Sequence, residues 1–227
     1  MDLSKQFSFT DFLAYFFPGS FAAVGLYFLL ILSPAQKFLV GVSFDITTGL
    51  VFLIFSYIIG VILSPFSSWV VKFFEKWKKF KSNQNVIPSD LFPDEIIKGF
   101  REVMGIAKDE KINWSRSHYR ICLMLVTEKM PLVAQRVDRQ RNVALFRRNL
   151  ISPLIIWGLT GLSWGTWLIT QNFIEWGVSL IVGSISLTAI LVGVTISRMH
   201  DGEKTETRET LSGFLAGYKL GAFTKQK

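Results

Sequence analysis

Residues 46–71, ITTGLVFLIFSYIIGVILSPFSSWVV, contain no charged residue. Three other stretches share this character: residues 12–34, 150–170 and 173–199, where Glu175 and Arg198 lie at the edges. A hydrocarbon core about 30 Å thick is crossed by roughly 20 apolar residues of helix. All four stretches reach that length. They predict an all-α membrane protein with four transmembrane helices, arranged as two helical hairpins.

The charge distribution predicts the orientation of these spans. Lysines and arginines gather near the span ends on one side, whereas the other side offers only Lys37. Cytosolic segments of membrane proteins carry such an excess of basic residues. We therefore expect a multi-pass protein with both termini and residues 72–149 in the cytosol.

Four regions follow from this arrangement. Residues 1–71 form the first hairpin, 72–149 a basic helical domain inserted between spans two and three, 150–199 the second hairpin and 200–227 a cytosolic tail. Residues 72–149 hold 17 Lys and Arg against 9 Asp and Glu, a surplus of 8 that equals the net charge of the whole chain. This surplus serves either topology and anionic headgroups or a binding surface for RNA, a nucleotide or an acidic protein.

Two groups of residues in this region suit a membrane surface. After span two, Trp69, Phe73 and Trp77 recur every four residues beside a row of lysines, which predicts an amphipathic helix at the headgroups. Two arginines immediately precede span three. The expected surface-anchoring residues are Trp69, Lys72, Lys76, Trp77, Lys79, Arg147 and Arg148.

A second arginine group is expected to lie farther from the membrane. Pro131 starts a predicted helix that runs unbroken into span three, so the arginines at 136, 139 and 141 lie roughly 10–20 Å from the membrane. Ser115 is expected to cap a helix from Arg116. The candidate ligand or partner residues are Arg116, Arg120, Arg136, Arg139 and Arg141. The alternative is pairing of the last three with Asp138, Glu128 or Glu102.

Small residues repeat every four positions in the spans and in the tail. Such spacing lets helix backbones approach closely in lipid, either within one chain or between copies in a homo-oligomer. In the tail the repeat predicts a partner surface, an interfacial segment or a frayed end. The expected packing glycines are Gly19, Gly60, Gly161, Gly165, Gly183, Gly193, Gly213, Gly217 and Gly221.

Catalytic signatures are absent from the sequence. It has no phosphate loop, GxGxxG, GxSxG or HExxH motif. One cysteine (Cys122) and two histidines (His118 and His200) are too few for a thiolate or histidine-rich metal site within one chain. No ionisable residue lies in the middle of a span, unlike in proton pumps and ion-coupled transporters. We expect a non-enzymatic protein without a cofactor or metal.

The layout resembles the small multi-span accessory membrane proteins of CRISPR and other antiphage defence systems. The resemblance lies in Pro18-Gly19 early in span one, Tyr57-Ile-Ile-Gly60 in span two and the arginine helix from Arg136 to Arg148. It implies a regulated effector that assembles in the membrane and perturbs it when infection is sensed.

Two functions are favoured at this point, ahead of a third, a lipid- or substrate-handling enzyme. The first is an oligomeric pore-forming or membrane-perturbing effector of the bacterial inner membrane, controlled through its cytosolic domain. The second is a membrane anchor or scaffold that recruits a cytosolic protein or nucleoprotein complex. The lipid bilayer is a partner in both.

Overall fold

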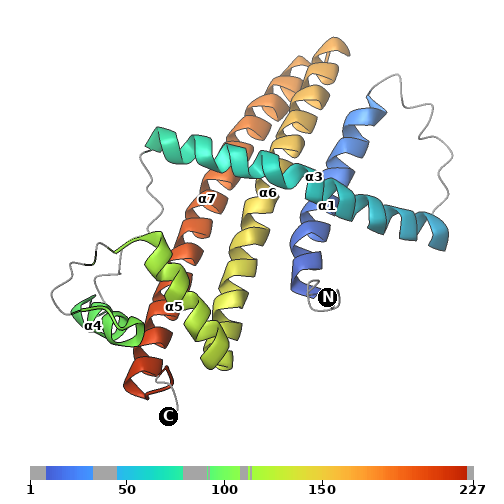
Figure 1. Ribbon diagram of the computed structural model, residues 1–227. Helices are drawn as coiled ribbons and strands as arrows, with labels where there is room; N and C mark the ends of the chain where they lie inside the picture. Colours follow the sequence, from blue (N-terminus) through green and yellow to red (C-terminus); the bar gives the residue numbers. More distant parts are fainter. Residues whose placement is uncertain are drawn as a thin grey trace. The chain divides into compact units, whose positions relative to one another are not determined.

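The computed structural model describes residues 9–32, 45–78, 91, 93–107, 112 and 114–223. Every regular element within these ranges is an α-helix, which confirms the all-α class. The helices are α1 (Phe9–Ile31), α3 (Ile46–Lys78), α4 (Pro93–Met104), α5 (Arg116–Lys129), α6 (Pro131–Thr170) and α7 (Ile174–Lys219), drawn in Figure 1. They form two compact units: a first unit of Met1–Phe80 with Leu145–Met199, and a second unit of Lys81–Ala144 with His200–Lys227.

Three helices, α1, α3 and α7, are long and apolar enough to cross a membrane. The fourth expected span, residues 150–170, lies within α6 and is helical throughout. Its hydropathy is lower because it contains three glycines, three tryptophans and five serines or threonines. By length and composition, the chain is therefore a helical membrane protein with three candidate spans.

In the first unit, α1 runs beside α6 in the same direction. Side chains of α6 donate hydrogen bonds to backbone oxygens of α1 along most of its length, and residue numbers rise together on both helices. The bonds run from Asn149 Nδ2 to Ala14 (3.1 Å), Trp157 Nε1 to Phe21 (2.9 Å), Thr160 Oγ1 to Gly25 (3.1 Å) and Trp164 Nε1 to Phe28 (3.2 Å).

Pro18 accounts for the first of these bonds. Proline has no N–H, so the carbonyl four residues earlier, that of Ala14, loses its helical donor. The buried Asn149 side chain supplies a donor in its place. Because a neighbouring helix satisfies the freed carbonyl, α1 continues through Pro18.

Helix α3 crosses α1 and contacts α6 (Figure 1). A Cβ atom on Gly19 would collide with the backbone of Ser56, and one on Gly60 with the backbone of Tyr15. The two backbones therefore touch at one place, where both helices carry glycine. Tyr57 of α3 also packs on Phe12 and Tyr15 of α1, with ring centroids 5.6 and 6.2 Å apart. The transmembrane hairpin that the sequence predicts for residues 1–71 stays a prediction.

Helices α6 and α7 form an antiparallel helical hairpin that contains residues 150–199. They turn at Asn172, whose positive φ of 67° is a conformation that asparagine tolerates better than most residues. A Cβ on Gly165 would lie 2.8 Å from the Gly177 oxygen, and a Cβ on Gly161 would collide with Ser184. Glycine therefore permits the close approach of these two helices.

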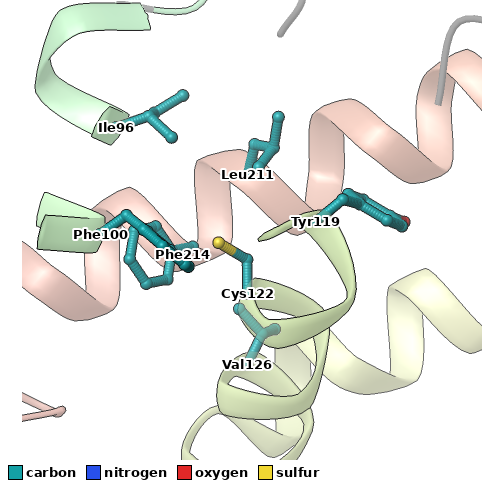
Figure 2. Close-up of a cluster of buried hydrophobic side chains, with 7 residues drawn as sticks. All are labelled: Ile96, Phe100, Tyr119, Cys122, Val126, Leu211 and Phe214. Carbon is teal, nitrogen blue, oxygen red and sulfur yellow. The ribbon is translucent and has the colours of Figure 1, made fainter. Parts of the chain in front are cut away.

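The second unit is built around seven buried side chains from α4, α5 and α7. Ile96 and Phe100 on one face of α4 lie against Phe214 of α7, with ring centroids of the two phenylalanines 6.4 Å apart. Gly105, with φ of 68°, follows the end of α4. Figure 2 shows the core residues Ile96, Phe100, Tyr119, Cys122, Val126, Leu211 and Phe214.

Helix α7 continues unbroken to Lys219, and its residues from His200 onward belong to the second unit. A Cβ on Gly213 would lie 2.5 Å from Val133, and one on Gly217 would lie 2.7 Å from the Met130 sulfur. Gly221 has φ of 70° and lies in the turn after the helix. The chain itself therefore covers Gly213 and Gly217.

Candidate ligand-binding groove

One side of α5 lies in the core of the second unit, and this leaves the other side exposed. Tyr119, Cys122 and Val126 are buried. Since a helix repeats every 3.6 residues, the opposite side of α5 points away from the core. Arg120 is exposed there and Met124 is 60% exposed, whereas Ile121, Leu123 and Leu125 are partly buried against the core.

This exposed side of α5 forms an open groove with α6. The groove has a volume of about 470 Å³. An apolar floor of Leu123 and Met124 is bordered by two arginines and two carboxylates. The lining residues are Arg120, Leu123, Met124, Thr127 and Glu128 from α5, and Asp138 and Arg141 from α6.

A buried carboxylate holds Arg141 at the edge of the groove. The Nη2 atom of Arg141 lies 3.3 Å from Glu206 Oε1, and its Nη1 atom lies 3.8 Å from Asp138 Oδ1. The Glu206 side chain is only 9% exposed, whereas that of Arg141 is 48% exposed. Pairing with Arg141 compensates the charge of this buried glutamate, which would be costly if left alone.

Tyr119 completes the network around Glu206. Its hydroxyl donates to Glu206 Oε1 at 3.1 Å and lies 3.2 Å from Thr210 Oγ1. Burial, and to a smaller extent the nearby Glu206 charge, raises the pKa of Tyr119 to about 12, although the bond to Thr210 opposes this. Burial also raises the pKa of the Cys122 thiol to about 12. Both groups stay protonated at neutral pH, so they support structure and supply neither a base nor a thiolate nucleophile.

The structure separates the five candidate arginines into two groups. Arg120 and Arg141 line the groove, and Arg116 lies one turn before Arg120 on α5. Arg136 and Arg139 are exposed on α6 but do not line the groove. Within the described ranges, these arginines other than Arg141 form no ion pair with a carboxylate.

Of the carboxylates named as alternative partners, only Asp138 pairs with an arginine of this set. Glu128 lies 3.0 Å from Lys129. Glu102 accepts a hydrogen bond from Tyr218 at 2.5 Å, which raises the pKa of that tyrosine. The described part of the chain holds no group of three or more His, Cys, Asp or Glu side chains suited to a metal ion.

The expected surface-anchoring residues are partly described. Trp69 is 61% exposed and stacks between Phe66 and Phe73, and Lys72 and Lys76 are also exposed. Lys79 and the Trp77 side chain lie outside what the structure describes.

The two arginines before residues 150–170 are half-buried. Arg147 Nη1 donates to the Arg198 backbone oxygen at 2.5 Å. The Nε atom of Arg148 is buried without a hydrogen-bond partner among the described residues.

Two of the expected packing glycines, Gly183 and Gly193, meet no neighbour in the described part of the chain. A Cβ atom on either would have none of its atoms within 4 Å beyond the helix itself. These glycines lie on α7 among exposed apolar residues such as Val182 and Ile190. They differ from Gly19, Gly60, Gly161 and Gly165, which neighbouring helices contact.

Sequence reasoning missed two residues that shape the molecule, Glu206 and Asn149. Glu206 belongs to the polar stretch 200–210, whose composition gives no sign of burial. The sequence feature that could have indicated its burial is the spacing of Glu206, Thr210 and Phe214, which places them on one face of a helix. The signal for Asn149 was Pro18, whose missing N–H requires a donor from another helix.

Comparisons with protein-family models, with curated proteins and with solved structures gave no match for this chain. Its function is therefore inferred from its own residues.

Proposed function

We propose that this chain is a non-enzymatic, multi-pass membrane protein that recruits an anionic cytosolic partner through the groove between α5 and α6. One observation carries the proposal. Arg120 lines the groove, and Arg116 is exposed one turn earlier on α5; neither has a carboxylate partner in the described ranges, while Glu206 holds Arg141 at the groove. Guanidinium groups suit carboxylate or phosphate groups.

The packing of the first unit supports a topology with both chain ends in the cytosol. Because α1 and α6 run in the same direction, the start of α1 and residue 145 of α6 lie toward the same end of the unit. The turn at Asn172 then lies toward the other end of the unit, and α7 runs back from it toward the first end. The basic residues Arg147, Arg148 and Arg198 favour a cytosolic location for the first end.

The recruiting function is tested with two labelled polyanions, a polyglutamate peptide and an oligoribonucleotide. Each is titrated into full-length protein in nanodiscs of neutral lipid. We expect one of them to bind, and Arg116→Gln with Arg120→Gln to weaken binding at least tenfold. The matched control is Arg136→Gln with Arg139→Gln, which removes equal charge outside the groove. Equal losses in both variants, or no binding of either probe, would contradict the proposal.

A second candidate, a pore-forming or membrane-perturbing homo-oligomer, is favoured by the uncovered side of α7. Gly183 and Gly193 meet nothing among the residues that the structure describes, which leaves room there for contact with a second copy. On the defence-system resemblance, the controlling signal would be infection.

Dye release from liposomes tests this candidate. Gly183→Leu with Gly193→Leu should abolish release if α7 lines the oligomer contact, whereas intact release from this variant would exclude that contact. Changes at Gly161 or Gly165 are unsuitable, because they disturb packing between α6 and α7 within one chain.

A further inference from the structure

The groove between α5 and α6 carries charges of both signs, and they lie at different places along it. The Tyr119 hydroxyl and Arg141 Nη2 both contact Glu206 Oε1, at 3.1 and 3.3 Å. Arg141 therefore lies level with the start of α5, where Arg120 follows Tyr119 along the chain. Glu128 lies two turns, about 12 Å, farther along α5. The two arginines thus share one end of the groove, and Glu128 lies at the other.

The carboxylate of α6 lies between these ends. Helix α6 begins at Pro131, directly after α5, and is level with the start of α5 at Arg141, so the two helices run in opposite directions. Asp138 precedes Arg141 by three residues and lies about 4.5 Å nearer the end of α5. Among the described residues that line the groove, two arginines are therefore balanced by two carboxylates. A uniformly charged polyanion meets repulsion here, whereas a ligand with charges of both signs finds partners at both ends.

The exposed side of α5 presents its groups in a regular order. Arg116, Arg120, Met124 and Glu128 follow one another at intervals of four residues and are all exposed. Residues at this interval form a ridge on a helix surface, with steps of about 6 Å. The order along the ridge is positive, positive, apolar, negative. A second helix with the complementary order matches it step by step.

The apolar part of the groove suits a protein better than a nucleic acid. The Met124 side chain is 60% exposed beside Leu123, which packs against the core of the second unit. Methionine is frequent at surfaces that bind amphipathic helices of other proteins. Surfaces that bind single-stranded nucleic acid stack its bases on aromatic rings. None of the described residues that line the groove is aromatic.

A helical segment fits this groove better than an extended one. The backbone groups within α5 and α6 are bonded inside their own helices. They therefore offer few partners to the backbone of an extended chain, whose N–H and C=O groups need hydrogen bonds when they are buried. A helix satisfies its own backbone and can lay its apolar side into the groove.

We propose that the groove between α5 and α6 binds an acidic amphipathic helix of a cytosolic protein. Two carboxylates of that helix pair with Arg116 and Arg120, and Arg141 adds a guanidinium donor at the same end. An apolar side chain one turn later covers Met124, and a basic residue one turn beyond pairs with Glu128. The inference rests on the proposed recruitment of an anionic partner, and it identifies that partner as a protein.

Two labelled, alanine-based helical peptides test the order of these groups. The matched peptide carries glutamate, glutamate, leucine and lysine at intervals of four residues. The control peptide has the same composition, with the leucine and the lysine exchanged. Each is titrated into full-length protein in nanodiscs of neutral lipid and followed by fluorescence anisotropy. We expect the matched peptide to bind about tenfold more tightly, and equal affinities would overturn the inference.

Variants of the groove locate the contact. Met124→Ala should weaken binding of the matched peptide about fivefold, because the peptide leucine loses its apolar contact. The control is Leu132→Ala, since Leu132 is 75% exposed on α6 but does not line the groove. Both native side chains are exposed, so neither change disturbs the core. Equal effects of the two changes would show that the peptide does not cover Met124.

A charge reversal tests the acidic end. Glu128→Lys should weaken binding of the matched peptide about threefold. It should strengthen binding of a peptide whose lysine is replaced by glutamate. The Glu128 side chain is 61% exposed, so the fold tolerates this change. If the preference between the two peptides is the same in both proteins, the proposed register is wrong.

The labelled oligoribonucleotide separates this inference from the recruiting function. If it binds more tightly than the matched peptide, and Arg116→Gln with Arg120→Gln weakens its binding, the recruiting function stands and the helical protein partner is excluded. If neither probe binds, the recruiting function fails together with the inference. Tighter binding of the matched peptide, lost in the same arginine variant, supports both.

Discussion

The hydrogen bond from Asn149 to the Ala14 carbonyl offers a sharp test of how the first unit is held together. Asn149→Leu removes the donor while keeping a side chain of similar size. The Ala14 carbonyl then has no partner, because Pro18 removes its helical donor. We expect the unfolding free energy to fall.

The size of the loss follows from two known ranges. Hydrogen bonds between membrane helices contribute about 0.6 kcal/mol on average and up to about 1.7 kcal/mol. A buried polar group left without a partner costs about 1–3 kcal/mol. Leucine also removes the buried Asn149 Oδ1 atom, which has no partner among the described residues. The expected loss is therefore about 1–1.5 kcal/mol.

A double-mutant cycle separates this cause from general loss of packing. Pro18→Ala restores the N–H that donates to Ala14 in a regular helix. In the chain that carries Pro18→Ala, the loss of unfolding free energy caused by Asn149→Leu should be at least about 1 kcal/mol smaller than in the native chain, because the Ala14 carbonyl keeps a hydrogen-bond partner. The control is Trp157→Phe, which removes the hydrogen bond from Trp157 to the Phe21 oxygen. That oxygen still accepts a hydrogen bond within its own helix, so the cost of this change should be the same with and without Pro18→Ala.

The assay is reversible SDS titration of purified protein in mild detergent micelles, followed by far-UV circular dichroism. An equal cost of Asn149→Leu in the native chain and in the chain that carries Pro18→Ala would refute the reasoning. A coupling as large for Trp157→Phe would also do so.

Three further predictions concern stability and reactivity. Gly60→Val should lower the unfolding free energy by at least about 1–3 kcal/mol, measured by the same titration, because its Cβ would collide with the Tyr15 backbone; an unchanged midpoint would contradict this crossing. The Cys122 thiol should react with a thiol reagent only after SDS unfolding, because it is buried and its pKa is raised to about 12; rapid reaction in the native state would show that the core is open. Tyr119 has a folded pKa of about 12 against an ordinary value of 10.0, so its contribution to the unfolding free energy is fully present below about pH 10 and is lost as pH rises toward 12. The unfolding free energy of Tyr119→Phe should therefore depend less on pH over that window than that of the native chain. Parallel pH profiles would argue against a buried hydroxyl.

Local signals located most of the helices correctly. Ser115 precedes α5 and Pro131 begins α6, as expected. These positions follow from the chain within a few residues of each helix end. A cap residue or a proline acts on its own turn, so a single sequence suffices to place such boundaries.

The sequence alone predicts some residues of the candidate groove but not their proximity. Arg120 and Arg141 are candidate ligand residues on sequence grounds, but nothing in their spacing places them together. Their meeting depends on Glu206, which is 65 residues from Arg141 along the chain. A long-range ion pair of this kind has no local signature, so the division of the arginines into two groups could not be anticipated.

The sequence by itself determined the helical class, the apolar stretches and the side on which positive charge accumulates, because each depends on composition within one segment. Only the tertiary structure decided how the helices meet. Gly19 and Gly60 let α1 and α3 cross closely, and Asn149 donates a hydrogen bond to the Ala14 carbonyl, which loses its helical donor at Pro18. Close packing and hydrogen-bond satisfaction join residues from distant segments, and those pairings exist only once the helices are assembled.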